Sequence, residues 1–547
     1  MTRYISLSFL LLLSNFATLA HATFMYISAK PVTCLNHLYE IEITQFSYDG
    51  SSVIFGGLEI VYGDGKVENI PDDDFTISVI DNGRKITKYI KTHAFQGPGI
   101  FTINARFFNR TANIRNMSNS VNTPFYVGTI LHIDPFLGCN TTPRLENFPL
   151  NHKSGTLYLQ DFSFIDQEND SLSFHFTVPL QDREIPVINY WLPCETDTEK
   201  QRKISRICID PYNGSLFMNS INLNGNYTVA IQINEWRKVN GTYYLMSSSI
   251  LDYQLEIIES ENNSPVISSL QDTAIVAGEI FYKAISISDP ENDSIMVNQY
   301  GDFFMLMKKL NEYDLNYYPG PVEILINFTP TPEEVRSKPY KIIYSCTDKN
   351  LQEISLNNTR SIYVWIAARE HQPEPPINFI GQAISPNLIN LYWKDTQDEL
   401  GYIIERADLH FPQFNRLVIV PANCKYFNDS SVVENNTYRY RIKAVGTTMS
   451  AYRTIEVSTP DIITSLKGEK MDDNLLIYPN PSTGSFSLRN VTRFDYLEIL
   501  DFSGRKVWTQ NLEKTKEMEI YPGLSKGTYL LNLYSADNTL CKKIVIK

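Results

Sequence analysis

The stretch Asp166-Gln167-Glu168-Asn169-Asp170-Ser171-Leu172 recurs, with few changes, as Asp289-Pro290-Glu291-Asn292-Asp293-Ser294-Ile295. The two copies lie about 120 residues apart, a period of domain size, so they predict two homologous domains. Around them, apolar runs of about five to eight residues recur between turn residues, and long helical stripes are scarce. We therefore predict an all-β fold of tandem β-sandwich, immunoglobulin-like domains in an elongated array.

The second copy lies in a segment that begins Asn262-Asn263-Ser264-Pro265-Val266-Ile267 and continues through Ala277-Gly278. This order of motifs resembles cadherin-like and immunoglobulin-like domains of bacterial surface proteins. The resemblance implies such a domain over residues 261–368. The repeat implies a homologous domain over residues 136–260.

The region before the repeats, residues 23–135, contains Tyr62-Gly63-Asp64-Gly65 and Gly97-Pro98-Gly99-Ile100-Phe101-Thr102-Ile103. These stretches resemble the G-D-G turn and the later strand of polycystic-kidney-disease (PKD) type domains, which implies a PKD-like β-sandwich. The alternative is that G-D-G is only a tight turn, since Gly and Asp favour turns in any fold.

A Pro-rich segment, Pro373-Glu374-Pro375-Pro376, marks a domain boundary. The strand-like runs after it are Ile389-Asn390-Leu391-Tyr392-Trp393, Gly401-Tyr402-Ile403-Ile404-Glu405-Arg406 and Asn436-Thr437-Tyr438-Arg439-Tyr440-Arg441-Ile442-Lys443-Ala444-Val445. They resemble a fibronectin type III domain over residues 374–460. The Trp is expected between the sheets, and Tyr438 is expected to form a tyrosine corner.

The end of the chain carries four turn-and-strand motifs in order. They are Leu476-Ile477-Tyr478-Pro479-Asn480-Pro481-Ser482-Thr483-Gly484, Asp501-Phe502-Ser503-Gly504-Arg505, Leu524-Ser525-Lys526-Gly527-Thr528-Tyr529-Leu530 and Lys542-Lys543-Ile544-Val545-Ile546-Lys547. Their turn residues predict a small sandwich over residues 474–547. The pattern resembles the type A C-terminal sorting domain of the type IX (Por) secretion system of Bacteroidetes. That resemblance implies recognition by the secretion machinery, cleavage by its sortase-like peptidase in the polar linker 461–473, and release or attachment to surface lipopolysaccharide.

The N-terminus agrees with export. Arg3 precedes an apolar core, and Ala20-His21-Ala22 forms an A-x-A signal, so residues 1–22 are predicted to be a signal peptide cleaved after Ala22. No later segment approaches the roughly 18 apolar residues of a transmembrane span. The predicted location is the medium or the outer-membrane surface, after transit through the periplasm. The net charge of -13 argues against a nucleic-acid partner.

Seven cysteines are spread along the chain. Because an exported chain meets an oxidising compartment, we hypothesise two disulfides, one joining Cys34 to Cys139 and one joining Cys194 to Cys208. No Cys or His cluster has zinc spacing, so a structural zinc site is not expected.

The acidic repeats are the candidate metal sites. Carboxylates that alternate along a loop can supply the hard oxygens that calcium prefers. One hypothetical calcium set is Asp166, Glu168 and Asp170, with Asn234 and Glu235 as the nearest late-strand counterparts. The other set is Asp289, Glu291 and Asp293, completed by Asp348, because the resembling cadherin-like domains use a late Asp. The alternative is that both loops are merely solvated acidic turns.

No nucleophile-elbow, zincin or phosphate-loop motif is present, so a non-enzymatic protein is predicted. The favoured function is an exported binding or adhesion-type protein with a glycan or protein ligand, and Trp191, Trp236 and Trp365 are candidate contact residues. Two alternatives remain: a secreted hydrolase with paired carboxylates in the N-terminal region, and a calcium-stiffened surface stalk. The triplets Asp170-Ser171-Leu172, Asp272-Thr273-Ala274 and Asp293-Ser294-Ile295 also resemble Bacteroidetes O-glycosylation acceptors.

Overall fold

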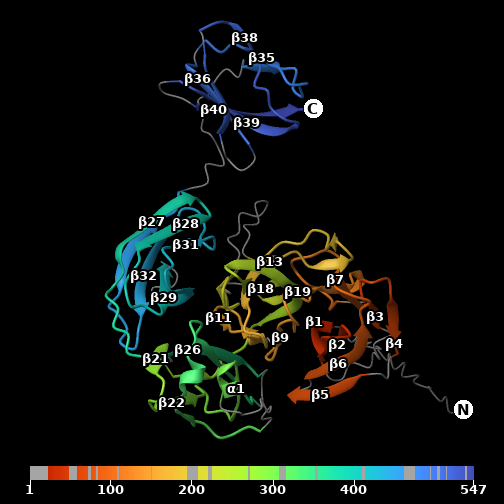
Figure 1. Ribbon diagram of the computed structural model, residues 1–547, viewed down its shortest axis with the longest axis vertical. Helices are drawn as coiled ribbons and strands as arrows, with labels where there is room; N and C mark the ends of the chain where they lie inside the picture. Colours follow the sequence, from red (N-terminus) through yellow and green to blue (C-terminus); the bar gives the residue numbers. More distant parts are fainter. Residues whose placement is uncertain are drawn as a thin grey trace, which may run out of the picture. The chain divides into compact units, whose positions relative to one another are not determined.

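The computed structural model describes residues 22–547 except for 49–57, 72–74, 82–83, 108–109, 149–150, 194–206, 220–223, 269–270, 307–315, 351–354, 409–412, 461–474, 493, 502–505, 513 and 536–538. The predicted signal peptide as far as residue 21, Cys194 and the predicted linker 461–473 lie outside the described residues. Strands dominate the described chain, as predicted (Figure 1). Two compact units are present, residues 1–461 and 462–547.

The first large feature is a 14-stranded sheet with the central order β4-β3-β7-β8-β19-β1-β2-β6-β5. Its strands in the first domain are β1 (Ala22–Thr33), β2 (Leu38–Tyr48), β3 (Leu58–Val61), β4 (Val67–Ile70), β5 (Thr76–Asp81), β6 (Arg84–Ala94), β7 (Gly99–Phe107) and β8 (Phe125–Ile133). The remaining strands of the sheet are β10 (His152–Lys153), β13 (Ser171–Thr177), β14 (Leu180–Asp182), β15 (Ile185–Pro186), β18 (Gly225–Val239) and β19 (Thr242–Ile258).

Strand β19 joins the first and second domains. One edge pairs with β18 along its length, and the other edge pairs with β8, β1 and β10 in turn. The sheet therefore crosses the boundary predicted at 135/136. Two apolar cores flank it, one built largely from β1–β8 and the other from β18, β19 and the shorter strands of the second domain. Those shorter strands are β9 (Arg144–Leu145), β11 (Leu157–Gln160), β12 (Phe164–Ile165), β16 (Ile207–Ile209) and β17 (Leu216–Asn219).

A buried ion pair holds this junction. The side chains of Arg110 and Asp252 are fully buried, with 2.5 Å between Nη2 and Oδ2. Arg110 also donates to Thr228 Oγ1 at 3.1 Å and to the carbonyl of Leu180 at 3.1 Å. A buried guanidinium with this many acceptors is satisfied, whereas either partner left alone would be a costly buried charge.

The predicted disulfide between Cys34 and Cys139 is confirmed, with a Cα–Cα distance of 5.7 Å. It links the end of β1 to the segment that enters the second domain. The predicted partner of Cys208 lies outside the described residues, so that pairing stays a prediction.

The two PKD-like stretches meet in space. Gly63 has φ +82°, and a Cβ there would lie 2.6 Å from the backbone nitrogen of Thr102 in β7. The neighbouring Asp64 carboxylate accepts the Lys66 N–H at 3.0 Å and contacts His93 Nε2 at 2.8 Å, and Tyr62 stacks on the His93 ring. Glycine is thus required where the turn packs against the strand.

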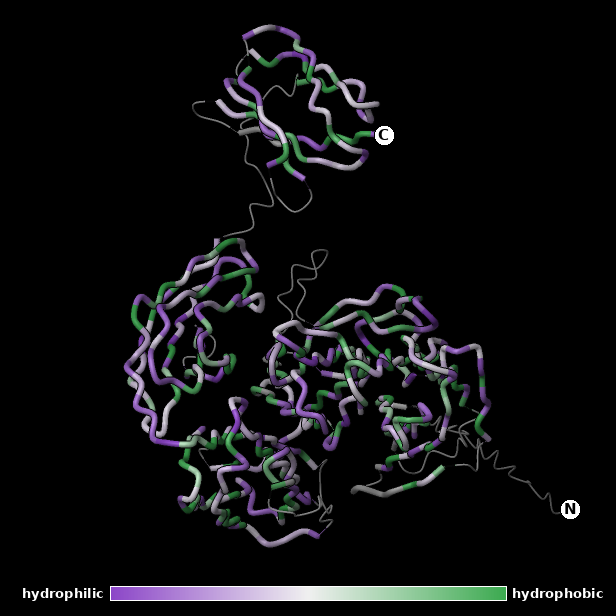
Figure 2. The backbone as a smooth tube through the Cα atoms, viewed as in Figure 1, coloured by the Kyte–Doolittle hydropathy of each residue, from purple (hydrophilic) through white to green (hydrophobic). Residues whose placement is uncertain are grey.

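The third domain is a sandwich of two sheets, ordered β20-β22-β24 and β21-β26-β25-β23. Its elements are β20 (Val266–Ile267), β21 (Thr273–Val276), β22 (Phe281–Ser288), β23 (Ile295–Tyr300), the short helix α1 (Phe303–Leu306), β24 (Val322–Phe328), β25 (Tyr340–Asp348) and β26 (Asn357–Ala367). Buried and exposed residues alternate along the second half of β22. Figure 2 colours the backbone by hydropathy, and hydrophobic and hydrophilic residues alternate along many strands. Short 3-10 turns occur at Ser120–Asn122 (η1) and Pro332–Glu334 (η2).

The fibronectin-like domain has sheets β27-β28-β31 and β30-β29-β32-β33. Its strands are β27 (Ile377–Ser385), β28 (Leu388–Lys394), β29 (Gly401–Asp408), β30 (Asn415–Pro421), β31 (Tyr426–Asp429), β32 (Thr437–Val445) and β33 (Arg453–Ser458). Trp393 is buried between the sheets, as predicted. Tyr438 forms the predicted tyrosine corner: its ring is fully buried and its hydroxyl accepts the Val433 N–H at 2.8 Å.

The unit 462–547 is a separate small sandwich. Its sheets are β34-β35-β38 and β37-β36-β39-β40. The strands are β34 (Leu476–Tyr478), β35 (Phe486–Arg489), β36 (Tyr496–Leu500), β37 (Lys506–Asn511), β38 (Glu517–Ile520), β39 (Gly527–Tyr534) and β40 (Thr539–Ile546). The turn after β34 is fastened to β40, because Asn480 Nδ2 donates to the Lys543 carbonyl and Asn480 Oδ1 accepts the Val545 N–H, at 2.8 and 2.9 Å. The first and last motifs of the C-terminal domain, which are far apart in sequence, are thus hydrogen-bonded to each other.

Candidate functional site

The two acidic repeats occupy equivalent places in the second and third domains. In each, the loop leads into an edge strand whose neighbour carries a late carboxylate. Leu172 of β13 pairs with Glu235 of β18, and the matching Ile295 of β23 pairs with Asp348 of β25. Glu235, which the sequence offered only as a nearest counterpart, is therefore the positional equivalent of Asp348.

The loop backbone is also the same in both repeats. The N–H of Asp170 donates to Asp166 Oδ1 at 2.5 Å, and the N–H of Asp293 donates to Asp289 Oδ1 at 3.0 Å. The Asn before each second Asp has a left-handed φ, 61° in one loop and 62° in the other. Asn tolerates this conformation better than most residues, which explains the N-D pair in the motif.

An upstream Asn closes each site. Asn140 Nδ2 donates to Glu235 Oε2 at 2.8 Å, and Asn262 Nδ2 donates to Asp348 Oδ2 at 3.0 Å. The residue after each Asn then binds the Glu of the repeat. The N–H of Thr141 donates to Glu168 Oε2 at 3.2 Å, and Asn263 donates to Glu291 through its N–H at 3.3 Å and its Nδ2 at 2.6 Å.

The structure therefore brings only some residues of the predicted ligand sets together. In the second domain, oxygens of Asp166, Asp170 and Glu235 lie within 4.8 Å of one another, and Glu168 is directed to Thr141 instead. The carboxylates of the third domain do not reach this spacing among the described residues. Sequence reasoning missed the two Asn side chains, although the shared N-x-x-P pattern of Asn140 and Asn262 was a signal for them.

Buried carboxylate oxygens are left without a hydrogen-bond partner in both sites. They are Asp166 Oδ2 and Glu235 Oε1 in the second domain, and Asp289 Oδ2 in the third. Burial raises the pKa of Glu235, and the adjacent Asp166 carboxylate adds to this effect. A buried carboxylate oxygen without a donor favours either a proton or a bound cation.

The two sites differ in one decisive residue. Arg237, two positions after Glu235, pairs with Asp170 at 2.6 Å and donates to Asn140 Oδ1 at 2.7 Å. The equivalent position in the third domain is Asn350, a neutral side chain that donates to Asp293 Oδ2 at 3.0 Å. The second-domain site thus contains its own cation, whereas the described residues of the third-domain site place a neutral amide at the equivalent position.

Electrostatics of the third-domain site agree with this difference. Burial raises the pKa of Asp348 to about 7, and the nearby charges of Asp289 and Asp293 contribute to the shift. Burial likewise raises the pKa of Asp289, which Asp293 and Glu291 reinforce. These carboxylates repel one another, and no positive side chain is paired with them among the described residues. A divalent cation would neutralise them and use their oxygens as ligands.

The tryptophans proposed as contact residues are partly or fully covered. Trp365 is buried among apolar side chains of the third and fibronectin-like domains, including Tyr363 and Ile403. Trp191 packs edge-on against Tyr227, and the Trp236 Nε1–H donates to Ser173 at 2.9 Å. Trp365 therefore contributes to a domain interface rather than to an exposed face.

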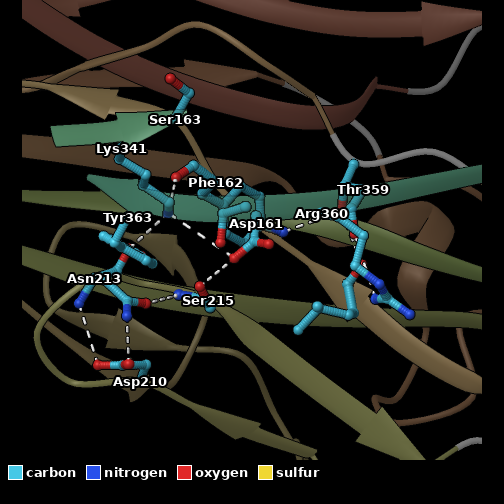
Figure 3. A network of polar contacts seen from close by, with 12 residues as sticks. Asp161, Phe162, Ser163, Asp210, Asn213, Ser215, Lys341, Thr359, Arg360 and Tyr363 are labelled. Carbon is cyan, nitrogen blue, oxygen red and sulfur yellow. Dashed lines mark hydrogen bonds and ion pairs between the residues drawn. The ribbon is translucent and has the colours of Figure 1, made fainter. Parts of the chain in front are cut away.

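A polar network joins the second and third domains. Figure 3 shows the Asp161 carboxylate between Lys341 and Ser215; its Oδ1 is 4.0 Å from Lys341 Nζ and accepts the Ser215 hydroxyl. Lys341 Nζ also donates to the Phe162 carbonyl at 2.9 Å, and Thr359 Oγ1 accepts the Asp161 N–H at 3.1 Å. These contacts fix one domain against the other through buried charge.

Comparisons with known proteins define the class of the chain. Residues 476–547 match the family described as secretion system C-terminal sorting domain. This sorting tail indicates that the chain is type IX secretion cargo, and it implies export to the cell surface or secretion. No helix among the described residues has the length and apolarity to span a membrane.

No curated protein matches the chain. Among solved structures, it is similar to the FN1–FN3 domains of chicken CNTN1, with 12% identity, a TM-score of 0.17, and 58% of this chain and 98% of that chain covered. Domains A168–A170 of titin match at 12% identity and a TM-score of 0.16, covering 58% and 98%. A two-domain fibronectin type III segment of chicken tenascin matches at 11% identity and a TM-score of 0.15, covering 36% and 99%.

Proposed function

We propose that the protein is a surface-displayed or secreted binding protein of the adhesion type, whose domains 23–460 present a ligand-binding face after export. The observation that carries this proposal is the sorting domain, which forms its own compact unit after the predicted linker. The sorting domain supports a location of the sandwiches outside the cell, and many cell-surface domains have the sandwich architecture.

Processing of the tail belongs to the same proposal. The type IX machinery recognises residues 474–547, and its sortase-like peptidase cuts in the linker 461–473. The boundary between the two compact units falls at residues 461 and 462, which supports a cut that leaves each unit intact. The remaining domains then stay attached to surface lipopolysaccharide or enter the medium.

Calcium is the second element of the proposal, and the third domain is its site. Asp289, Asp293 and Asp348 supply carboxylate oxygens, and among the described residues no Lys or Arg lies within 4 Å of any of these three carboxylates. Bound calcium would rigidify the start of the third domain, because Asn262 and Asn263, just after the second domain, bind Asp348 and Glu291. This favours a calcium-stiffened array as part of the binding function.

The test of export compares cells that produce the full chain with cells that produce a chain ending before Leu475. We expect the full chain on the surface or in the medium and the shortened chain in the periplasm. A matched control fuses residues 461–547 to an unrelated periplasmic protein, which should then be exported. Arrival of the shortened chain in the medium at the same level would refute the sorting assignment.

The test of binding uses the purified full chain on arrays of glycans and extracellular matrix proteins, with calcium and with chelator. Saturable binding to one ligand class supports the proposal. Absence of saturable binding in both conditions would contradict it.

A further inference from the structure

Three domains meet around a cavity of about 710 Å³ that none of the acidic repeats enters. Its walls come from β16 and β17 of the second domain, β26 of the third, and β29, β30 and β32 of the fibronectin-like domain. This volume falls within the range of small-molecule binding sites, about 300–1,000 Å³. Because side chains from three domains line it, the cavity exists only in the assembled chain.

The lining is unusually basic for an acidic protein. It contains the cations Arg360, Arg406, Arg416, Arg441 and Lys443 and the carboxylates Asp210, Asp272 and Glu405. The whole chain, in contrast, has a net charge of -13. Cations gathered in a recess of a negative protein create a local positive potential that attracts anions.

Part of this charge is neutralised within the protein. Arg416 binds both Asp272 oxygens, at 2.9 and 3.0 Å, and Arg441 pairs with Glu405. Arg406 pairs at 2.6 Å with Asp429, which lies outside the cavity lining. These three arginines are therefore fixed parts of the wall.

Two cations in the wall remain without a carboxylate. Among the described residues, no acidic oxygen lies within 4 Å of the charged groups of Arg360 or Lys443, and the hydrogen bond from the Arg360 guanidinium goes to the Thr359 carbonyl at 3.4 Å. Both side chains are half-buried. Burial lowers the pKa of Arg360, so its positive charge is held at a cost that an anion would relieve.

The nearest buried acids are already engaged. Asp161 faces Lys341 and the Ser215 hydroxyl (Figure 3). Asp210 accepts the Tyr212 and Asn213 N–H groups of its own loop, at 2.8 and 3.2 Å, and burial raises its pKa to about 6. The Asp161 charge raises the pKa of Arg360 from beyond ion-pair distance and also acts on Lys341 and Arg416, so no acid among the described residues forms an ion pair with Arg360.

We infer that this cavity binds an acidic saccharide of one to three sugar units, whose carboxylate or sulfate group contacts Arg360 and Lys443. The inference rests on the proposed binding function and names its ligand class. Gln271, Asn415 and the hydroxyl of Ser268 line the same cavity and can bond sugar hydroxyl groups. Sugar size follows from the volume, and the acid group follows from the unpaired cations.

An acidic peptide fits the same cavity less well. The carboxylates of Asp272 and Glu405, which Arg416 and Arg441 hold, share the wall with the cations, and the side chains of an acidic peptide carry no hydroxyl group to donate to them. The same carboxylates accept hydrogen bonds from sugar hydroxyls. The Tyr452 ring in the wall lies close to two cations, the Arg441 guanidinium at 4.0 Å and the Lys443 ammonium at 4.9 Å from its centroid, so cation–π attraction holds Lys443 at the cavity.

The experiment is calorimetric titration of the purified full chain with trigalacturonate, with a sulfated disaccharide, with neutral maltotriose and with a triglutamate peptide. We expect binding of at least one acidic probe, with at least tenfold weaker binding of maltotriose. Arg360→Gln and Lys443→Gln should each weaken binding of that probe about tenfold or more. Lys425→Gln, an exposed lysine outside the cavity, is the matched control and should leave binding unchanged.

Carboxylated and sulfated probes distinguish the two sources of the negative charge. Equal binding of maltotriose, tighter binding of a triglutamate peptide, absence of binding by all probes, or unchanged affinity in both cavity variants would overturn the inference. Melting curves of the variants check folding, and the comparison of acidic with neutral probes needs only the unaltered chain. Because the titration uses purified protein, its failure leaves the export test unaffected.

Discussion

Calcium should stabilise the third domain more at high pH than at low pH, because the carboxylates of its acidic site must lose their protons to bind the ion. The perturbation is addition of calcium to the full chain after treatment with chelator. Asp348 accepts the Leu356 N–H at 2.9 Å and the Asn262 amide at 3.0 Å, so its oxygens are positioned before any ion binds. Its raised pKa, about 7, means that calcium competes with a proton there.

The size of the effect follows from this competition. With a pKa of about 7, Asp348 is roughly 90% ionised at pH 8 and roughly 3% ionised at pH 5.5, so calcium affinity should fall about 30-fold between them. At a calcium concentration 100 times the dissociation constant at pH 8, the stabilisation is about 2.7 kcal/mol. The same concentration at pH 5.5 gives about 0.9 kcal/mol.

The sign for the calcium-free chain is the opposite. A carboxyl whose folded pKa is raised stabilises the fold when it is protonated, so stability should fall as the pH rises from about 4 to about 7. Calcium removes this loss at high pH. For a domain of about 100 residues, 1 kcal/mol corresponds to about 4–8 °C, so the midpoint of thermal unfolding of the third domain should rise by about 11–22 °C with calcium at pH 8 and by about 4–7 °C at pH 5.5.

Differential scanning calorimetry at both pH values, with calcium or with chelator, measures the shift. Asp348→Asn should abolish the calcium effect, and Glu279→Gln, an exposed acid in the same domain, should preserve it. A calcium shift of equal size at pH 5.5 and pH 8, or an undiminished shift in Asp348→Asn, would refute the reasoning.

Three further outcomes are expected. Arg237→Asn, which copies Asn350 of the third domain, should lower the free energy of unfolding in chelator by about 3–5 kcal/mol because it leaves the second-domain carboxylates unpaired, and calcium should restore part of the loss. A variant whose stability does not respond to calcium would contradict this. Replacing Cys34 and Cys139 by Ser should lower the free energy of unfolding, measured by chemical denaturation, by about 2–5 kcal/mol. An unchanged denaturation midpoint under oxidising conditions would show that the disulfide does not stabilise the fold. Arg110→Met should slow or prevent folding of the N-terminal sheet, seen as lost circular dichroism or a melting point lowered by several degrees, whereas a native melting curve would show that the buried pair is dispensable.

The fold class and the tail could be read from local patterns, since turns, strand alternation and the tyrosine corner depend on residues close in sequence. The ligand set of the second domain could not. Glu168 and Asp170 are near neighbours, yet one binds Thr141 and the other meets Arg237, because strand register decides which side chains face each other. A comparison of the positions two residues after Glu235 and Asp348 would have pointed to the Arg.

Two features could be recognised only in the folded structure. The continuous sheet across residues 135 and 136 depends on β19, whose 17 residues are long enough to pair with β8, β1 and β10 in succession. The cavity likewise combines side chains from strands that lie far apart in sequence, such as Leu157 of β11 and Lys443 of β32. Residue spacing in the sequence does not predict contacts between strands that are this far apart in the chain.

The shared strand has a practical consequence for anyone who divides this protein into fragments. A piece that starts near residue 136 keeps β19 but loses β1 and β8, so the N–H and C=O groups along one side of that long strand would be open to water and to other chains. Such a fragment should self-associate, whereas cuts near residues 260 or 370 divide none of the sheets formed by the described strands. Recombinant work on the N-terminal half is best served by taking residues 22–258 as an indivisible piece.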